Sequence, residues 1–301
     1  MISKPEPMCP TSPTWSSMLV ELLLLTRPRN CVLTGISVWV GAVTSGADNA
    51  SFEVILAAIG AAAIAGSGNG MNDVVDLEVD RCNRPDRPLP SGRLSAGAAL
   101  AVSALLGVTG LTLAFVAGII PGMIAFAVVI GLALYNWFLK RVGLAGNVLV
   151  SLIAASTFPY GAAATAAAAG GDDWGRWWIP ALFASLYHVA RELVKGVEDA
   201  EGDGLAEVHT VAQVRGIGPA CRAAAILFGL VGLVAPLPAL VGIYGVAYLV
   251  PVFVLDVFLV DTMRRLWKGF APDSPRLSPR LLFGMALGLV AVVLGEFLDR
   301  S

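Results

Sequence analysis

Oxygen-bearing side chains recur at helical spacing in the first candidate motif, which covers residues 69–80. Asn72, Asp76 and Asp80 follow one another at intervals of four residues, and Asp73 lies three residues before Asp76. Residues three and four apart share one face of a helix, whereas the apolar residues between them occupy other faces. If the helix continues to Asp80, the sequence predicts a stripe of carboxylates on one side of an apolar helix.

A second acidic cluster covers residues 191–203. Asp199 and Asp203 repeat the interval of four residues, Lys195 lies one turn before Asp199, and Arg191 lies one turn earlier still. Gly202 is expected to end this helix. The second motif therefore combines carboxylates with two positive charges on the same predicted face.

The chemistry that suits these motifs is the binding of a hard cation together with a phosphate group. Two carboxylates about 4 Å apart repel each other by roughly 4 kcal/mol at an effective dielectric constant near 20. Mg²⁺ prefers a few carboxylates, retained water and phosphate oxygens, so we expect metal ions to join a diphosphate to both motifs. The alternative is a solvated loop whose charges have no role, and two matched clusters make it the weaker interpretation.

The turn at residues 83–93 is rich in arginine and proline. Arg84 and Arg87 are candidates to grip the diphosphate from a lid over the site. The turn can equally be a proline-stiffened connector that supplies positive charge to one membrane face. The two interpretations are compatible.

The segments that must position these motifs are membrane helices. The chain has 301 residues, of which 56% are hydrophobic and 14% are charged, against about 25% charged in soluble domains. A membrane span needs about 20 apolar residues, and lipid leaves helices as the way to pair their backbone groups. The sequence predicts an all-α, polytopic membrane protein with nine transmembrane helices around a central cavity, at roughly 19–44, 52–71, 95–116, 119–138, 144–169, 177–194, 217–234, 238–260 and 281–298.

The positive charges predict the orientation of these helices. With nine spans, all of the 20 lysines and arginines except Arg176 and Arg300 fall on one face, and that face is expected to be cytoplasmic. The N terminus is then inside the cell, the C terminus is outside, and the acidic motifs lie toward the cytoplasm. Residues 1–18 are expected to be a flexible cytoplasmic tail, and residues 19–301 a single transmembrane domain in the plasma membrane.

The two motifs and their surroundings resemble a known family. The pattern Asn72-Asp73-x-x-Asp76-x-x-x-Asp80, followed by residues 83–88, is similar to the first motif of the UbiA superfamily of intramembrane prenyltransferases, and residues 199–203 are similar to its second. The resemblance implies a nine-helix bundle and two Mg²⁺ ions. It assigns the metal ligands as Asn72, Asp76, Asp80, Asp199 and Asp203.

Further short segments are similar to the ether-lipid branch of this family, including residues 27–31 and Arg191-Glu192-x-x-Lys195. That branch implies geranylgeranylglyceryl phosphate as the acceptor, with Asn30 in the substrate site and Lys140 or Arg141 as a candidate for its phosphate. The chain also departs from the family pattern. Gly196 stands where an aspartate is usual, and Gly204 where a basic residue is common.

We therefore expect an enzyme that moves a prenyl group, with geranylgeranyl as the expected chain, from its diphosphate to a lipophilic acceptor. Asp76, Asp80, Asp199, Asp203 and Lys195 are the expected catalytic residues. Aromatic acceptors, namely a hydroxybenzoate, a quinone precursor or a chlorin, are the alternative, and a cation-coupled transporter is the rival class. A formal net charge of -2 indicates no nucleic-acid partner, and no obligate protein partner is expected.

Overall fold

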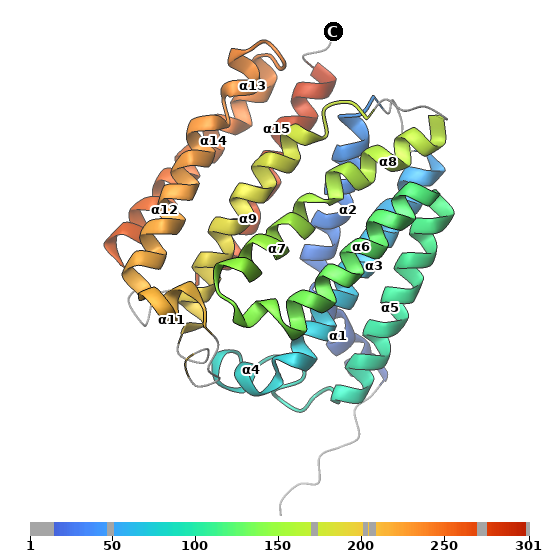
Figure 1. Ribbon diagram of the computed structural model, residues 1–301, viewed down its shortest axis with the longest axis vertical. Helices are drawn as coiled ribbons and strands as arrows, with labels where there is room; N and C mark the ends of the chain where they lie inside the picture. Colours follow the sequence, from blue (N-terminus) through green and yellow to red (C-terminus); the bar gives the residue numbers. More distant parts are fainter. Residues whose placement is uncertain are drawn as a thin grey trace, which may run out of the picture.

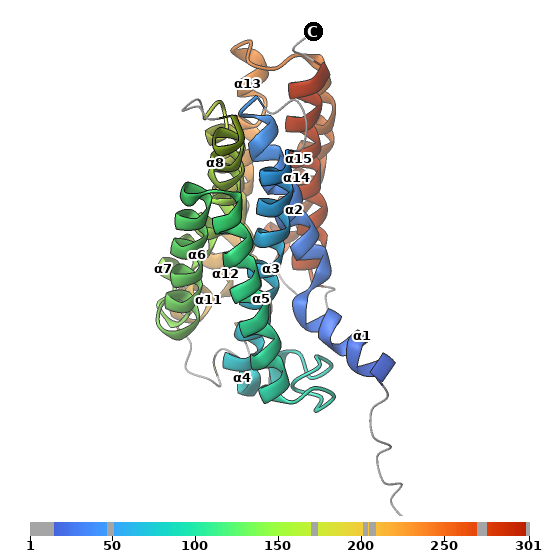
Figure 2. The same ribbon diagram turned by 90° about the vertical axis from the view of Figure 1, so that its right-hand side faces the viewer.

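The protein is a bundle of long helices, seen in a computed structural model that describes residues 15–46, 51–169, 174–200, 204, 209–269 and 276–298. No strand occurs in these ranges. Figures 1 and 2 show the long helices running side by side, with α1, α4 and α11 at one end of the bundle and α13 at the other. The last helix finishes at the end opposite α1. The helices are α1 (Trp15–Thr26), α2 (Pro28–Val43), α3 (Phe52–Val75), α4 (Leu77–Asn83), α5 (Ala96–Ala117), α6 (Ile119–Trp137), η1 (Leu139–Arg141), α7 (Leu144–Ala155), α8 (Thr157–Ala169), α9 (Trp178–Glu198), α11 (Val211–Arg215), α12 (Ile217–Val234), α13 (Leu237–Leu240), α14 (Val246–Lys268) and α15 (Ser278–Leu298).

The helix crossings depend on glycines that let two backbones touch. A Cβ atom on Gly161 of α8 would collide with the backbone carbonyl of Val38 in α2, and one on Gly110 of α5 would collide with that of Gly60 in α3. Small residues at crossings are typical of membrane helices, where close van der Waals packing drives association. These two contacts hold α2 and α3 together with α5 and α8 on one side of the bundle.

The outer surface of the bundle is apolar. Ile119, Phe253 and Val246 expose 71%, 71% and 75% of their surface, respectively, which in water would be an aggregation hazard. Seven described segments are long and apolar enough to cross a bilayer, so the protein is a multi-pass membrane protein. They are Phe52–Val75, Ala96–Ala117, Ile119–Trp137, Leu144–Ala169, Ile217–Leu240, Val246–Lys268 and Ser278–Leu298.

The count of nine spans is not confirmed, and the two remaining segments show why. The block predicted at 19–44 is broken at Arg27, which has a left-handed backbone (φ 54°) and precedes Pro28, so that α2 has 16 residues. Helix α9 has 21 residues but carries Arg191, Glu192 and Lys195 on its last turns. One segment is therefore short and the other polar.

Two other expectations on helix boundaries are corrected. The block at 144–169 is two helices, α7 and α8, which meet at Ser156. The helix of the first motif does not run straight to Asp80, because Asp76 leaves helical geometry (φ -91°, ψ 7°) between α3 and α4. Helix α1 begins at Trp15, so the end of the expected tail is helical, and residues 1–14 lie outside the described part.

Candidate active site

A cavity of about 510 Å³ opens between α2, α3, α6, α7, α8, α9 and α15. Its lining is polar near α4, where both acidic motifs end, and apolar deeper in the bundle, where Ile64, Val128, Leu132 and Met285 contribute. The volume lies in the range of small-molecule sites. This arrangement suits an amphipathic ligand whose anionic head stays at the mouth while its hydrocarbon lies inside.

The first motif brings Asn72 and Asp76 together on one wall of the cavity. The Asn72 side-chain amide donates to the Asp76 carboxylate at 2.7 Å. Lys140, on η1, donates to Asn72 Oδ1 at 3.2 Å and forms an ion pair with the same carboxylate of Asp76. Lys140 or Arg141 is expected at the phosphate of an acceptor, and in the structure Lys140 contacts the first motif.

The other two acids of the first motif are buried under arginines. Asp73 and Asp80 expose 2% and 5% of their surface. Arg87 donates to Asp80 at 2.5 Å and to Asp73 at 3.0 Å, and Arg27 forms a further ion pair with Asp73. Asp80 lines the cavity but Asp73 does not, so Asp73 holds two arginines in place and lies behind the expected substrate site.

Burial and neighbouring charges together shift the pKa values of Asp80 and Arg87. Burial raises the pKa of Asp80 above its ordinary value, and the Arg87 guanidinium reduces that rise without cancelling it. Burial likewise lowers the pKa of Arg87, aided by the charges of Arg27 and Arg84. A cluster of this kind stabilises a bound anion or cation more strongly than the same groups would in water, because the local dielectric constant is low.

Asp199 of the second motif connects its own segment with two distant parts of the chain, residues 83–84 and Arg276. Its carboxylate accepts from Arg84 at 2.5 Å and from Arg276 at 3.0 Å, and its backbone carbonyl accepts from Asn83 at 3.2 Å. Burial opposes the charge on Arg84, but the Asp199 carboxylate outweighs this effect and holds the pKa of Arg84 above its ordinary value. Asn83 and Arg84 come from the predicted lid, so the lid lies against the second motif.

The residue before Asp199 fixes the start of the last helix. One carboxylate oxygen of Glu198 accepts from the backbone N–H groups of Leu277 and Ser278, at 2.5 and 2.9 Å. Such a carboxylate satisfies donors that a helix start leaves unpaired. No local sequence pattern marks Glu198 or Arg276 as part of the site, because their partners lie more than two helices away along the chain.

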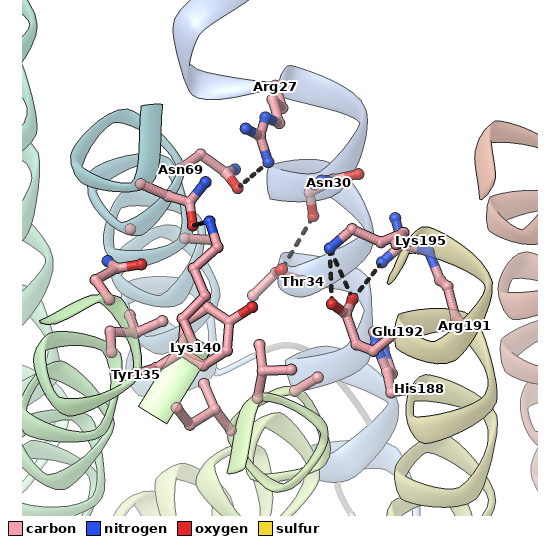
Figure 3. Close-up of a pocket in the computed structure, with 18 of the residues that line it drawn as sticks. Arg27, Asn30, Thr34, Asn69, Tyr135, Lys140, His188, Arg191, Glu192 and Lys195 are labelled. Carbon is pink, nitrogen blue, oxygen red and sulfur yellow. Dashed lines mark hydrogen bonds and ion pairs between the residues drawn. The ribbon is translucent and has the colours of Figure 1, made fainter. Parts of the chain in front are cut away.

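A third group of charges lies on the cavity wall formed by α9 (Figure 3). Lys195 donates to both carboxylate oxygens of Glu192, at 2.9 and 2.8 Å, and Arg191 donates to one of them at 3.3 Å. His188 lies one turn earlier on the same face. Across the cavity stands Asn30 of α2, whose backbone carbonyl accepts from the Thr34 hydroxyl at 2.9 Å.

Part of the predicted site falls outside what the structure describes. Asp203 is outside the described residues, and so is the side chain of Arg141. Within the described ranges, no three acidic, histidine or cysteine side chains converge as a preformed metal site. The physical reason is that Asp73, Asp76, Asp80 and Asp199 each face a cation of the protein itself.

The helical bundle and its charged cavity mouth define a membrane enzyme that handles an anionic, hydrocarbon-bearing substrate. The chain belongs to the UbiA prenyltransferase family, whose model matches residues 33–285. It is therefore a prenyltransferase, and the transporter hypothesis is wrong.

Individual proteins of this family share the fold of the chain, and some of them are also similar to it in sequence. The chain is 36% identical over 277 residues to the digeranylgeranylglyceryl phosphate synthase of Metallosphaera sedula, covering 91% of this chain and 95% of that protein. A solved structure of digeranylgeranylglyceryl phosphate synthase matches with 28% identity and a TM-score of 0.66, over 92% of this chain and 98% of that one. A UbiA homologue from Archaeoglobus fulgidus bound to DMAPP and Mg²⁺ has the same fold, with 18% identity and a TM-score of 0.66, over 91% of this chain and 98% of that one.

Proposed function

We propose that this protein transfers a geranylgeranyl group from its diphosphate to geranylgeranylglyceryl phosphate, in the synthesis of ether lipids. The observation that carries the proposal is the likeness to digeranylgeranylglyceryl phosphate synthases along nearly the whole chain. The cavity supports it, because an apolar interior below a charged mouth suits an isoprenoid chain with an anionic head. The chain forms one functional domain from residue 19 to the C terminus.

The oxygen donors around the cavity mouth fit magnesium. Asn72, Asp76, Asp80 and Asp199 all line the cavity, and hard oxygen ligands are those that Mg²⁺ takes. Together with Asp203 they would hold two ions, with the diphosphate oxygens and water completing the coordination. Bound Mg²⁺ supplies Lewis-acid neutralisation of the leaving diphosphate.

The protein's own residues then have three tasks in the transfer. Arg84 and Arg87 turn from their acidic partners toward the diphosphate and stabilise the charge that develops on it, while Lys195 adds positive charge beside the second motif. The apolar lower cavity holds the prenyl chain and keeps water from the allylic carbon. The allylic C–O bond breaks and diphosphate leaves with its electron pair. A lone pair of the acceptor hydroxyl oxygen forms the new ether C–O bond to the allylic carbon, and the hydroxyl proton passes to the released diphosphate.

The same proposal includes the orientation in the plasma membrane. The break at Arg27 leaves α2 to cross the bilayer with help from α1, and the charged end of α9 lies at the cavity mouth. Counting these two with the seven long apolar segments gives nine spans, with the N terminus and the acidic motifs at the cytoplasmic face. The placement of α1 and the end of α15 at opposite ends of the bundle is compatible with this odd count.

One experiment decides between the acceptor classes. Membranes containing the protein are incubated with labelled geranylgeranyl diphosphate, Mg²⁺ and a panel of acceptors, and the products are identified by mass spectrometry. We expect the mass of digeranylgeranylglyceryl phosphate from the glycerol ether. Products from a hydroxybenzoate or a quinone precursor alone would assign the chain to the aromatic branch instead.

A further inference from the structure

Arg191 stands apart from the other cations of the cavity. Its side chain lines the cavity and is 14% exposed. Within the described residues its guanidinium donates one hydrogen bond, of 3.3 Å, to the carboxylate of neighbouring Glu192, and its buried Nε has no hydrogen-bond partner. A guanidinium group has five N–H donors, and Arg191, which lines the cavity, uses one of them for its hydrogen bond to Glu192.

The remaining cations at the mouth are bound to the two acidic motifs. Lys140 contacts Asn72 and Asp76, and Arg87 contacts Asp73 and Asp80. Arg84 also has an unpartnered Nε, but its ion pair with Asp199 at 2.5 Å ties it to the second motif. Arg191 and Lys195 contact Glu192 alone among the acids of the described residues, and Glu192 is not one of the expected metal ligands.

The group formed by Arg191, Glu192 and Lys195 differs from the expected diphosphate site in its position and in its net charge. Arg191 lies eight residues before Asp199 on α9, which is about 12 Å along a helix axis. Two cations and one carboxylate leave a net positive charge on the α9 wall of the cavity, where the three side chains are largely buried. A buried charge without a partner is costly, and a phosphate monoester, with a charge of about −1.5 to −2 at neutral pH, would offset it.

We infer that Arg191 is the residue that binds the phosphate of the acceptor lipid, with the Lys195–Glu192 pair holding it toward the cavity. The planar guanidinium can give two parallel hydrogen bonds to phosphate oxygens. In this position it selects a phosphorylated glycerol ether over an uncharged acceptor. The inference rests on the proposed function, and it moves the phosphate contact from Lys140 to the opposite wall of the cavity.

The test compares geranylgeranylglyceryl phosphate with the dephosphorylated alcohol as acceptor for the full-length protein, at saturating geranylgeranyl diphosphate. The measured quantity is the ratio of the two kcat/KM values. The wild-type protein should prefer the phosphorylated acceptor by about 10- to 150-fold, the range of one lost charge-assisted contact. Arg191→Gln should reduce this preference to about threefold or less, and Arg191→Lys should keep part of it.

Lys140→Gln is the matched control, because it removes a cation from the other wall. It should lower kcat/KM for both acceptors by the same factor and leave their ratio unchanged. An Arg191→Gln variant that keeps the wild-type ratio would overturn the inference while leaving the proposed function intact. A wild-type protein that ignores the phosphorylated acceptor would instead overturn the proposed function.

Binding is measured separately, so that an inactive variant still gives an answer. Without diphosphate, the phosphorylated acceptor should raise the thermal unfolding midpoint of the wild type more than the alcohol does. Arg191→Gln should lose this difference, and Arg191→Lys should retain part of it. Equal stabilisation of wild type and Arg191→Gln by the phosphorylated acceptor counts against the inference.

Discussion

Replacing Lys140 with glutamine should strengthen Mg²⁺ binding in the absence of substrate, although Lys140 lies in the active site. The Lys140 ammonium donates hydrogen bonds to the Asp76 carboxylate and to the Asn72 amide oxygen, which are two of the expected metal ligands. A metal ion that binds there without diphosphate must displace this charge. Removing the charge therefore removes a competitor, and the affinity for Mg²⁺ should rise.

The contacts of Lys140 set the size of this effect. A hydrogen bond between charged groups contributes about 1.5–3 kcal/mol. Lys140 and Asp76 have side chains that are 24% and 13% exposed, so solvent screening favours the lower end of that range. A change of about 1.4 kcal/mol is tenfold in a binding constant, and we expect Mg²⁺ to bind about tenfold more tightly.

The assay is a titration of purified protein with Mn²⁺, followed by electron paramagnetic resonance, with Mg²⁺ as competitor. Lys140→Arg keeps the charge and serves as the control, and its metal affinity should stay close to that of the wild type. Weaker metal binding by Lys140→Gln would refute the reasoning, since it would mean that Lys140 supports the ligands instead of competing for them.

Three further outcomes are expected. Excess chelator should abolish prenyl transfer, and added Mg²⁺ should restore it, as product formation in membranes will show; full activity in chelator would contradict the assigned metal ligands. Asp199→Asn should lose most turnover and lower the unfolding midpoint, because Arg84 loses its 2.5 Å partner, whereas Glu78→Gln, at a 76% exposed side chain, should change neither. The exposed Cys82 should react with an impermeant thiol reagent added from the cytoplasmic side. The new thiol of a Leu298→Cys variant should react from the opposite side, and labelling of both thiols from one side is incompatible with the proposed topology.

Most of the long helices could be predicted from local patterns of hydrophobicity in the sequence. Long apolar blocks correspond to α3, α5, α6, α12 and α15 because hydrophobic length is a property of each segment alone. The block predicted at 238–260 is offset, since the preceding span continues to Leu240 and α14 covers Val246–Lys268. The breaks were harder to place. Pro28 disfavours helical geometry at Arg27, and this signal was present in the sequence, but the apolar run on both sides concealed it. The break at Asp76 has no such marker.

The candidate site was predictable where its residues are close in sequence, and not where they are distant. The spacing of Asn72 and Asp76 predicted that they share a helix face, and in the structure their side chains are hydrogen-bonded at 2.7 Å. No local pattern indicated that Arg276 would bind Asp199, because the contact joins residues 77 positions apart. Asp73 shared the pattern of its neighbours, yet the direction of its side chain away from the cavity depends on the bend at Asp76 and on two arginines from other segments.

The capping of α15 by Glu198 has a consequence for how the enzyme is made. A ribosome delivers the chain from the N terminus, and domains form as their segments emerge. When Asp199 has been synthesised, Arg276, Leu277 and Ser278, which bind Asp199 and Glu198 in the folded protein, are still missing. A chain interrupted before its final helix would therefore hold every acidic residue of both motifs in the membrane, but without the partners that fix the second motif, so prenyl transfer begins only after the last span has been inserted.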